Sequence, residues 1–184
     1  EEAAMSRIGR LHINIPAGVT VEYKDQVVSV KGPKGALSRH IDSKNIGVTV
    51  EGNEVKVTRS NDEKETKAMH GLYRVLIADM VAGVVTPFTK TLVIAGVGYK
   101  ASVAGNKLTM SLGLSHPVEY VAPEGITLTC PDANTVVVTG VSKERVGQVA
   151  ANIKSKRPVE PYHNYGIHYS DEVLVKKEGK TAGK

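Results

Sequence analysis

The chain has no tryptophan and a single phenylalanine, and aromatic residues make up only 4% of its 184 residues. Its core must therefore be built from valine, isoleucine, leucine and alanine, a composition that favours β-structure. Hydrophobic residues make up 41% of the chain, which is ordinary for a soluble globular protein. No apolar run approaches the roughly 20 residues that span a bilayer, and no secretory signal is recognisable. We expect no membrane association and a cytoplasmic location.

The single cysteine excludes an internal disulfide. Cys130 ends the alternating stretch 126–130, where we expect a small buried side chain rather than a catalytic thiol. The histidines are scattered, and none has the spacing of a zinc site. A metal site formed by His163 and His168 with Asp171 or Glu172 is the weaker alternative. We expect neither a metal nor a cofactor.

Motifs for catalysis are also lacking. Gly96-Val97-Gly98 resembles the start of a dinucleotide-binding loop, but Ala101 stands where the third glycine would be and no helix pattern follows. Glycines inside a strand more often mark a bulge or a close approach of another backbone. The pair Ser115-His116 lacks the glycines of a nucleophile elbow. No nucleophile has a recognisable base, and we expect no enzymatic activity.

Two stretches about 107 residues apart share one pattern. Each begins with Pro-x-Gly, continues as apolar-Thr-apolar, and ends in a β-branched run that closes on glycine; the stretches are residues 16–32 and 123–140. Such a match seldom arises twice by chance at similar internal distances. It predicts two copies of one β-hairpin unit and a duplicated fold.

Each copy also contains one helix pattern. The first helix is predicted to begin near residues 60–62, with a capping box formed by Ser60 and Glu63 or by Asp62 and Glu65, and to end at Gly83. Its expected buried stripe is Met69, Leu72, Tyr73, Leu76 and Met80. The second helix is predicted to begin at Ser142, to end before Pro158, and to bury Val146, Val149, Ala150 and Ile153.

Strand-like alternation occupies residues 47–50, 54–59, 91–97, 99–104 and 107–112, with turn signals at 31–35, 51–54 and 105–106. We therefore predict an α+β fold of two similar domains, each with antiparallel sheets and one packed helix. The linker is expected within residues 80–89. The predicted organisation is an N-terminal extension at 1–4, a first domain at 5–82, a second domain at 83–157 and a basic, aromatic C-terminal arm at 158–184.

Positive charge is concentrated near the C-terminal end. The formal net charge is +5, and residues 142–184 carry nine basic and five acidic side chains, whereas residues 86–141 carry three of each. Cationic side chains neutralise phosphates, and tyrosines offer faces on which bases stack. Pro158 and Pro161 exclude a helix or a central strand, so the arm should run extended over a surface, and residues 173–175 could form a last short strand. The residues predicted to bind a polyanion, through charge or stacking, are Lys154, Lys156, Arg157, Tyr162, His163, Tyr165, His168, Tyr169, Lys176, Lys177 and Lys180.

Several short runs, spread over nearly the whole chain, occur in the order known from one family. They are Met5-Ser6-Arg7-Ile8-Gly9, Val30-Lys31-Gly32-Pro33-Lys34-Gly35, His70-Gly71-Leu72, Gly96-Val97-Gly98-Tyr99, Leu112-Gly113-Leu114-Ser115-His116-Pro117-Val118, and Pro161-Tyr162 through Gly166-Ile167-His168-Tyr169. Together they resemble the bacterial sixth protein of the large ribosomal subunit, ribosomal protein L-six.

The resemblance implies two similar α+β domains and a structural role in the large ribosomal subunit, without catalysis or a cofactor. It implies that the second domain and the arm bind large-subunit ribosomal RNA at the stalk base, near the region that engages translational GTPases. Neighbouring ribosomal proteins and, transiently, those GTPases are the other implied partners. The family typically has Pro-Tyr-Lys-Gly-Lys-Gly, whereas His163 and Tyr165 replace its two lysines here. This departure favours stacking over charge pairing in that patch.

A different class of function is also compatible with the sequence. A β-rich adaptor would bind proteins through exposed sheet edges, with no RNA role and with its arm merely solvated. Capture of partners with a salt-dependent RNA component distinguishes the two.

Overall fold

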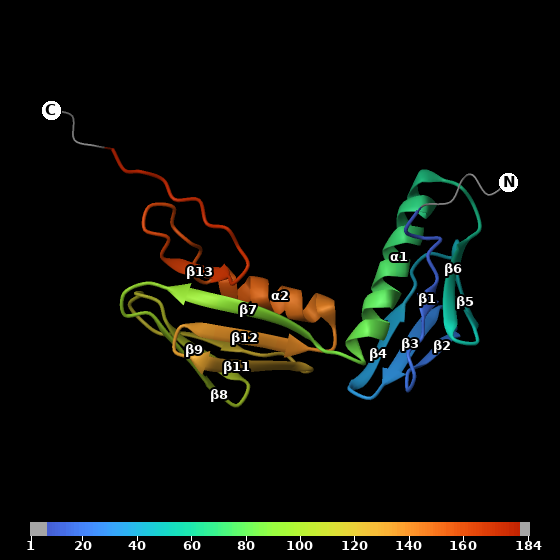
Figure 1. Ribbon diagram of the computed structural model, residues 1–184, viewed down its shortest axis with the longest axis horizontal. Helices are drawn as coiled ribbons and strands as arrows, with labels where there is room; N and C mark the ends of the chain where they lie inside the picture. Colours follow the sequence, from blue (N-terminus) through green and yellow to red (C-terminus); the bar gives the residue numbers. More distant parts are fainter. Residues whose placement is uncertain (1–6, 181–184) are drawn as a thin grey trace. The chain divides into compact units, whose positions relative to one another are not determined.

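The computed structural model describes residues 7–180. The expected extension at residues 1–4 lies outside the described residues. The chain divides into two units between Pro87 and Phe88, and residues 141–143 belong with the first unit (Figure 1). This division lies between the first helix and the strand that follows it. None of the described helices is long and apolar enough to cross a membrane.

The first unit combines two three-stranded antiparallel sheets with one helix. One sheet has the order β1-β6-β5, and the other has the order β2-β3-β4. The helix packs against β3, β5 and β6 and closes a core of aliphatic side chains. The elements are β1 (Ile13–Asn14), β2 (Thr20–Lys24), β3 (Val27–Gly32), β4 (Gly35–His40), β5 (Ile46–Glu51), β6 (Glu54–Arg59) and α1 (Lys64–Gly83).

The second unit repeats this plan with a larger sheet. A four-stranded sheet has the order β11-β12-β7-β13, and a three-stranded sheet has the order β10-β9-β8; every pairing is antiparallel. Helix α2 lies across the four-stranded sheet (Figure 1) and contributes to the same core. The elements are β7 (Phe88–Ala95), β8 (Lys100–Ala104), β9 (Lys107–Ser111), β10 (Val118–Val121), β11 (Ile126–Asp132), β12 (Thr135–Gly140), α2 (Lys143–Lys154) and β13 (Gly166–Tyr169).

The predicted hairpins are confirmed. The two repeated stretches form β2-β3 and β11-β12, each an antiparallel pair. Turns at residues 33–34, 52–53 and 105–106 connect paired strands, as their glycine-containing sequences predicted. The α+β prediction, with antiparallel sheets and one helix in each half, is therefore correct. The glycines near the end of β7 allow a close approach: a Cβ at Gly96 would lie 2.4 Å from the ring of Tyr99.

The predicted face of α1 is wrong in part. Leu72 is 49% exposed, whereas His70 is fully buried, with its Nε2 2.7 Å from the carbonyl oxygen of Val57. Because a carbonyl oxygen only accepts, Nε2 carries the proton and donates this hydrogen bond. The helix has apolar residues on both sides, so spacing alone does not say which side faces the sheets. The buried positions are Thr66, His70, Tyr73, Ile77, Met80, Val81 and Gly83.

The predicted capping box of α1 is also wrong. The N-cap is Glu63, and its side chain makes no capping hydrogen bond. The polar residues before it are used elsewhere, since Asn61 accepts from the backbone N–H of Glu63 and Asp62 pairs with Arg59. An Asx turn and an ion pair therefore replace the expected cap.

Helix α2 matches its prediction. Val146, Val149, Ala150 and Ile153 are all buried, and the helix ends at Lys154, before Pro158. They pack with aliphatic side chains of the sheet, namely Leu92, Ile94, Val136 and Val138. Cys130 is half-buried against this core, in agreement with a packing role.

The arm contains a strand that the sequence did not reveal. Residues 166–169 form β13, which pairs with β7 at the edge of the four-stranded sheet. The predicted strand at 173–175 is wrong: these residues are irregular, and Val173 is 89% exposed. β13 is an edge strand, and Pro158 and Pro161 precede it. Because proline has no backbone N–H, the segment before β13 cannot extend the strand as part of a central ladder.

Candidate nucleic-acid interface

The arm is fixed to the second unit through Ile167. This side chain is fully buried in the core, and Ile167 pairs with Ile94 across the β7-β13 ladder. The backbone N–H of Ile167 donates to the carbonyl oxygen of Arg157 at 2.8 Å. The candidate residues on either side of Ile167 are thus carried by an ordered backbone.

Gly166 allows the chain to cross closely over itself. Its φ is +143°, and a Cβ at this position would lie 2.6 Å from both the carbonyl oxygen of Pro158 and the Cα of Val159. Real Cβ atoms do not approach backbone so closely. Glycine is therefore required where the arm turns from residue 158 to β13.

Residues 160–165 form a compact loop around the carboxylate of Glu160. Its two oxygens accept the backbone N–H groups of Tyr162, at 3.1 Å, and His163. The backbone N–H of Glu160 donates to the carbonyl oxygen of Tyr165, and Asn164 adopts the left-handed conformation with φ of 58°. Burial raises the pKa of Glu160, but several neighbouring groups, first among them the backbone N–H groups of His163 and Tyr162, lower the pKa, which lies below its ordinary value.

Two aromatic rings stack at the tip of this 160–165 loop. The rings of His163 and Tyr165 have centroids 5.5 Å apart and an interplanar angle of 25°. The His163 side chain is 71% exposed, and its Nδ1 lies 3.2 Å from Glu160. Tyr165 is 38% exposed, and Tyr162 is 49% exposed. The loop therefore presents aromatic faces to solvent while its backbone is held from within.

Lys154 is engaged inside the unit rather than free for a phosphate. Its Nζ forms an ion pair with Glu172 and lies 4.7 Å from the centroid of the Tyr169 ring. The hydrogen bond from Lys154 lowers the pKa of Glu172, and the backbone N–H of Tyr169 lowers it further. Lys90 of β7 lies over the same ring, with Nζ 5.2 Å from the centroid. Tyr169 is thus contacted by two cations, one of which is neutralised.

Lys90 was not predicted from the sequence. It is an exposed lysine and the single charged residue of β7. Only the pairing of β7 with β13 brings it to Tyr169. Lys90 could have been found only as a lysine on a strand that pairs with the arm, and the pairing of β7 with β13 was not predicted.

The other predicted cations are mostly exposed and lie on both sides of the 160–165 loop. Arg157 is half-buried and precedes the loop. The backbone N–H of Lys177 donates to the carbonyl oxygen of Pro161 at 2.8 Å, which brings the end of the arm back beside the loop. His168 is half-buried, and its Nδ1 is enclosed without a hydrogen-bond partner among the described residues. The exposed cations are Lys156, Lys176, Lys177 and Lys180.

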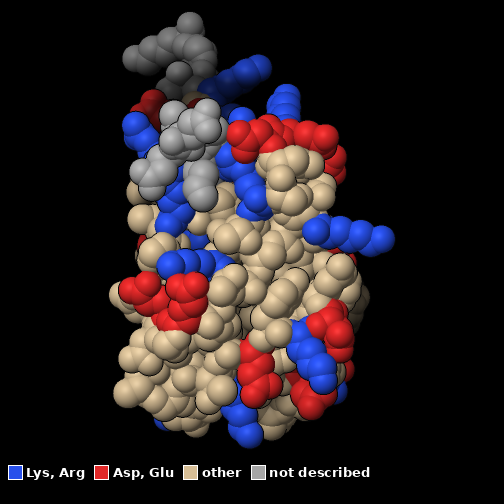
Figure 2. Space-filling model, turned by 90° about the vertical axis from the view of Figure 1, so that its right-hand side faces the viewer, with Lys and Arg blue, Asp and Glu red and all other residues tan. Residues whose placement is uncertain are grey.

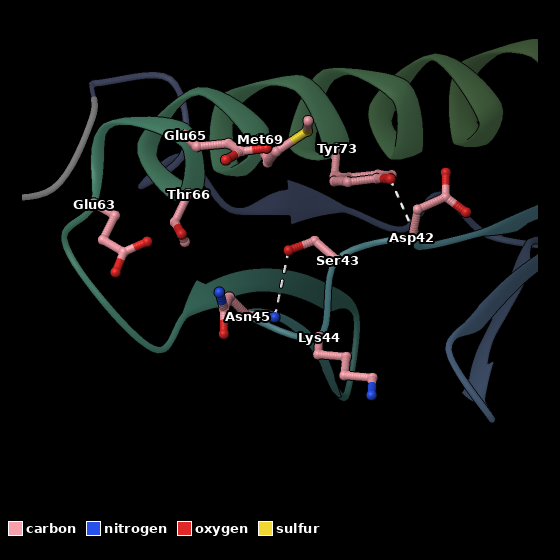
Figure 3. A pocket seen from close by; sticks show the side chains of 9 residues that line it. All are labelled: Asp42, Ser43, Lys44, Asn45, Glu63, Glu65, Thr66, Met69 and Tyr73. Atoms are coloured by element: carbon pink, nitrogen blue, oxygen red, sulfur yellow. Dashed lines mark hydrogen bonds between the residues drawn. The ribbon is translucent and has the colours of Figure 1, made fainter.

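Pockets and polar pairs elsewhere offer little chemistry. A pocket of about 420 Å³ beside the start of α1 is lined by residues including Asp42, Lys44, Glu63 and Tyr73 (Figure 3). The Tyr73 hydroxyl accepts the backbone N–H of Asp42, so it already has a structural role. The carboxylates there include Glu63 at the start of the helix, where negative charge is favourable in any case.

The Ser115-His116 pair and Cys130 resemble catalytic groups, but their surroundings do not favour a reaction. Ser115 Oγ and His116 Nδ1 are 3.2 Å apart, but both are exposed neighbours in the chain. Burial raises the pKa of the Cys130 thiol, which lowers its fraction of reactive thiolate. Figure 2 shows a face on which lysines and arginines are interspersed with aspartates and glutamates rather than gathered by sign. At the arm, by contrast, exposed lysines and exposed aromatic rings occur in one segment, with Tyr162 and Tyr165 between Lys156 and Lys176 in the chain.

Lysines clustered along one segment, with exposed aromatic rings between them, are typical of nucleic-acid-binding proteins. Comparison with known proteins specifies the class. The family model for ribosomal protein L6 matches the chain twice, at residues 15–86 and 95–170. The chain therefore belongs to the ribosomal protein L6 family, and the two matches confirm the internal duplication.

Individual relatives agree along nearly the whole chain. The chain is 54% identical over 177 residues to the large ribosomal subunit protein uL6 of Exiguobacterium sibiricum, a match that covers 96% of this chain and 99% of that protein. It is 53% identical over 178 residues to uL6 of Clostridium acetobutylicum, with the same coverage, and 51% identical over 181 residues to uL6 of Mesoplasma florum, with 98% and 100% coverage.

Proposed function

We propose that this chain is a structural constituent of the large ribosomal subunit that binds large-subunit ribosomal RNA through its second unit and arm. Its family membership supports the ribosomal role. The observation that carries the site is the arrangement of exposed cations on both sides of an ordered aromatic loop. The proposed RNA-binding residues are those predicted from the sequence, with Lys90 added and with Lys154 acting through Tyr169.

The finer placement follows from the same proposal. We place the protein in the large subunit in the cytoplasm, at the stalk base near the region that translational GTPases engage, with neighbouring ribosomal proteins as further contacts. Its role is structural and not enzymatic. The organisation into a first domain, a second domain and an arm at 158–184 serves this role, because the second domain holds the arm's backbone through β13.

Phosphate contacts predict a steep dependence of RNA affinity on salt. If about five cations meet phosphates of duplex-like RNA, the affinity should fall roughly 10²- to 10³-fold between about 50 and 200 mM salt. Deleting the arm is a poor test, because it would remove Ile167 from the core and destabilise the unit. Point substitutions separate charge from folding.

The experiment compares two variants with the same reduction in positive charge, by filter binding to large-subunit ribosomal RNA fragments across a salt series. The arm variant replaces Lys156, Arg157, Lys176 and Lys177 by glutamine. The control variant makes the same replacement at four exposed lysines of the first unit, Lys24, Lys31, Lys34 and Lys44.

The arm variant should bind more weakly, and its log–log salt slope should flatten by roughly 0.7–0.9 for each phosphate that is no longer neutralised. The control variant should keep the slope of the unmodified chain. Equal effects of both variants would place the contacts elsewhere, and binding without a salt dependence would favour a protein-binding adaptor.

A further inference from the structure

The 160–165 loop lies in the middle of a stretch without lysine or arginine. Residues 158–175 contain no lysine and no arginine, although cations precede and follow this stretch. Glu160 is the one residue of the loop with a formal charge. Its negatively charged carboxylate is 37% exposed and repels phosphates. The loop is therefore unsuited to bind the RNA backbone itself.

The exposed rings are not needed to hold the loop together. Its conformation is set by the Glu160 carboxylate, by the backbone bond between Glu160 and Tyr165, and by the close crossing at Gly166. Aromatic side chains usually stabilise a fold by being buried in its core. Here His163 and Tyr165 instead remain exposed and stacked on one another.

Cations bracket this stack on both sides. Lys156 and Arg157 precede the loop, and the hydrogen bond from the backbone N–H of Lys177 to the carbonyl oxygen of Pro161 brings Lys177 next to it. A polynucleotide whose phosphates are neutralised by these flanking residues would cross the loop, with its bases free to meet the rings. Base–aromatic stacking tolerates any sequence but requires a base that is not already stacked and paired in a duplex.

We propose that the stacked rings of His163 and Tyr165 form a preorganised platform for one unpaired RNA base, and that Glu160 positions this platform. The inference rests on the proposed RNA-binding function and specifies the ligand at the loop. It assigns the loop to unpaired nucleotides and the flanking cations to the backbone. Tyr165 is a binding residue in this scheme, whereas Glu160 acts through the loop and is a positioning residue.

The test uses the full chain and a single-stranded oligouridylate of about ten nucleotides with a central 2-aminopurine, alone or annealed to an oligoadenylate that has one uridine opposite the probe. Stacking of the probe on a ring quenches its fluorescence. Tyr165→Leu keeps an apolar side chain but removes the flat ring, and Tyr165→Phe keeps the ring. His116→Ala is the control for His163→Ala, because His116 is an exposed histidine of the same unit outside the loop.

We expect Tyr165→Leu to abolish the quenching and to weaken single-strand binding by roughly 5- to 100-fold, the range for removing one stacking aromatic residue. His163→Ala should weaken single-strand binding in the same direction. Duplex binding should change less than about twofold in both variants, since paired bases do not use the platform. Tyr165→Phe and His116→Ala should behave like the unmodified chain. Glu160→Gln should weaken single-strand binding more than duplex binding and should speed hydrogen exchange at the amides of Tyr162 and His163.

Unchanged quenching and unchanged single-strand affinity in Tyr165→Leu would overturn the platform. If the four-cation arm variant still binds RNA more weakly in that case, the proposed RNA-binding function stands without it. If the unmodified chain binds neither the probes nor ribosomal RNA, both proposals fail. Circular dichroism and amide exchange in β13 verify that each variant retains the fold.

Discussion

Gly166→Ala should strongly destabilise the second unit, although Gly166 is only the first residue of β13. The new Cβ would lie 2.6 Å from the Pro158 carbonyl oxygen and from the Val159 Cα. Both are backbone atoms, so no side-chain rotation relieves the contact. An unfavourable φ costs about 1–3 kcal/mol, and overpacking costs about 1–3 kcal/mol more. The free energy of unfolding should therefore fall by roughly 2–6 kcal/mol, a large part of the typical 5–15 kcal/mol of a domain.

The matched control is Gly147→Ala, in the interior of α2, where a Cβ would meet nothing within 4 Å. That substitution should raise the free energy of unfolding by roughly 0.5–1 kcal/mol, because alanine is the better helix former. Urea unfolding gives the stability difference, and hydrogen exchange read by mass spectrometry shows whether β13 and β7 lose protection together. If Gly166→Ala unfolds at the same urea concentration as the unmodified chain, with β13 fully protected, the close crossing does not hold the arm.

Three further predictions concern buried and charged side chains. Ile77→Ala should lower the free energy of unfolding of the first unit by about 2–5 kcal/mol, because this side chain is buried. Leu72→Ala should change the free energy of unfolding by less than about 1 kcal/mol, because Leu72 is exposed. Urea unfolding of the two variants shows which face of α1 packs against the core. The hydrogen bond from Lys154 holds the pKa of Glu172 below its ordinary value of 4.5 in the folded chain, so its contribution to stability is complete above 4.5 and disappears as the pH falls through the folded pKa. Protection of the Tyr169 amide should accordingly weaken only below pH 4.5, and weakening near pH 6 would contradict this cause. Lys90→Ala should flatten the salt slope of RNA binding by roughly 0.7–0.9, and an unchanged slope would remove this lysine from the interface.

The hairpins and α2 were predictable because their signals are local. Gly105-Asn106 sits between two alternating runs, and the four buried residues of α2 have a single helical spacing with no competing apolar face. The face of α1 was not predictable in the same way. Leu72 and His70 lie on different sides of a helix with apolar residues on both, and only packing against Val57 decides that the histidine is buried.

The candidate site likewise has a part that local sequence signals predict and a part that only tertiary packing determines. Its exposed cations and tyrosines could be found from charge and composition, since those properties belong to single residues. The strand β13 could not, because Gly166-Ile167-His168-Tyr169 has no distinctive alternation and follows two prolines. The roles of Lys154, Glu172 and Lys90 depend on that strand, as they all meet at Tyr169.

The place of β13 in the chain bears on when the second unit can fold during synthesis. The strand completes a sheet whose other members are β7, β11 and β12, all made earlier, and Ile167 fills the core that those strands leave open. A nascent chain that has not yet emerged past residue 169 therefore has an unpaired edge on β7 and an unfilled core. The second unit should close only after nearly all of the described chain is released. A shortened product would consequently have a destabilised second unit and a 160–165 loop whose backbone is no longer held by β13, and such a product is prone to degradation.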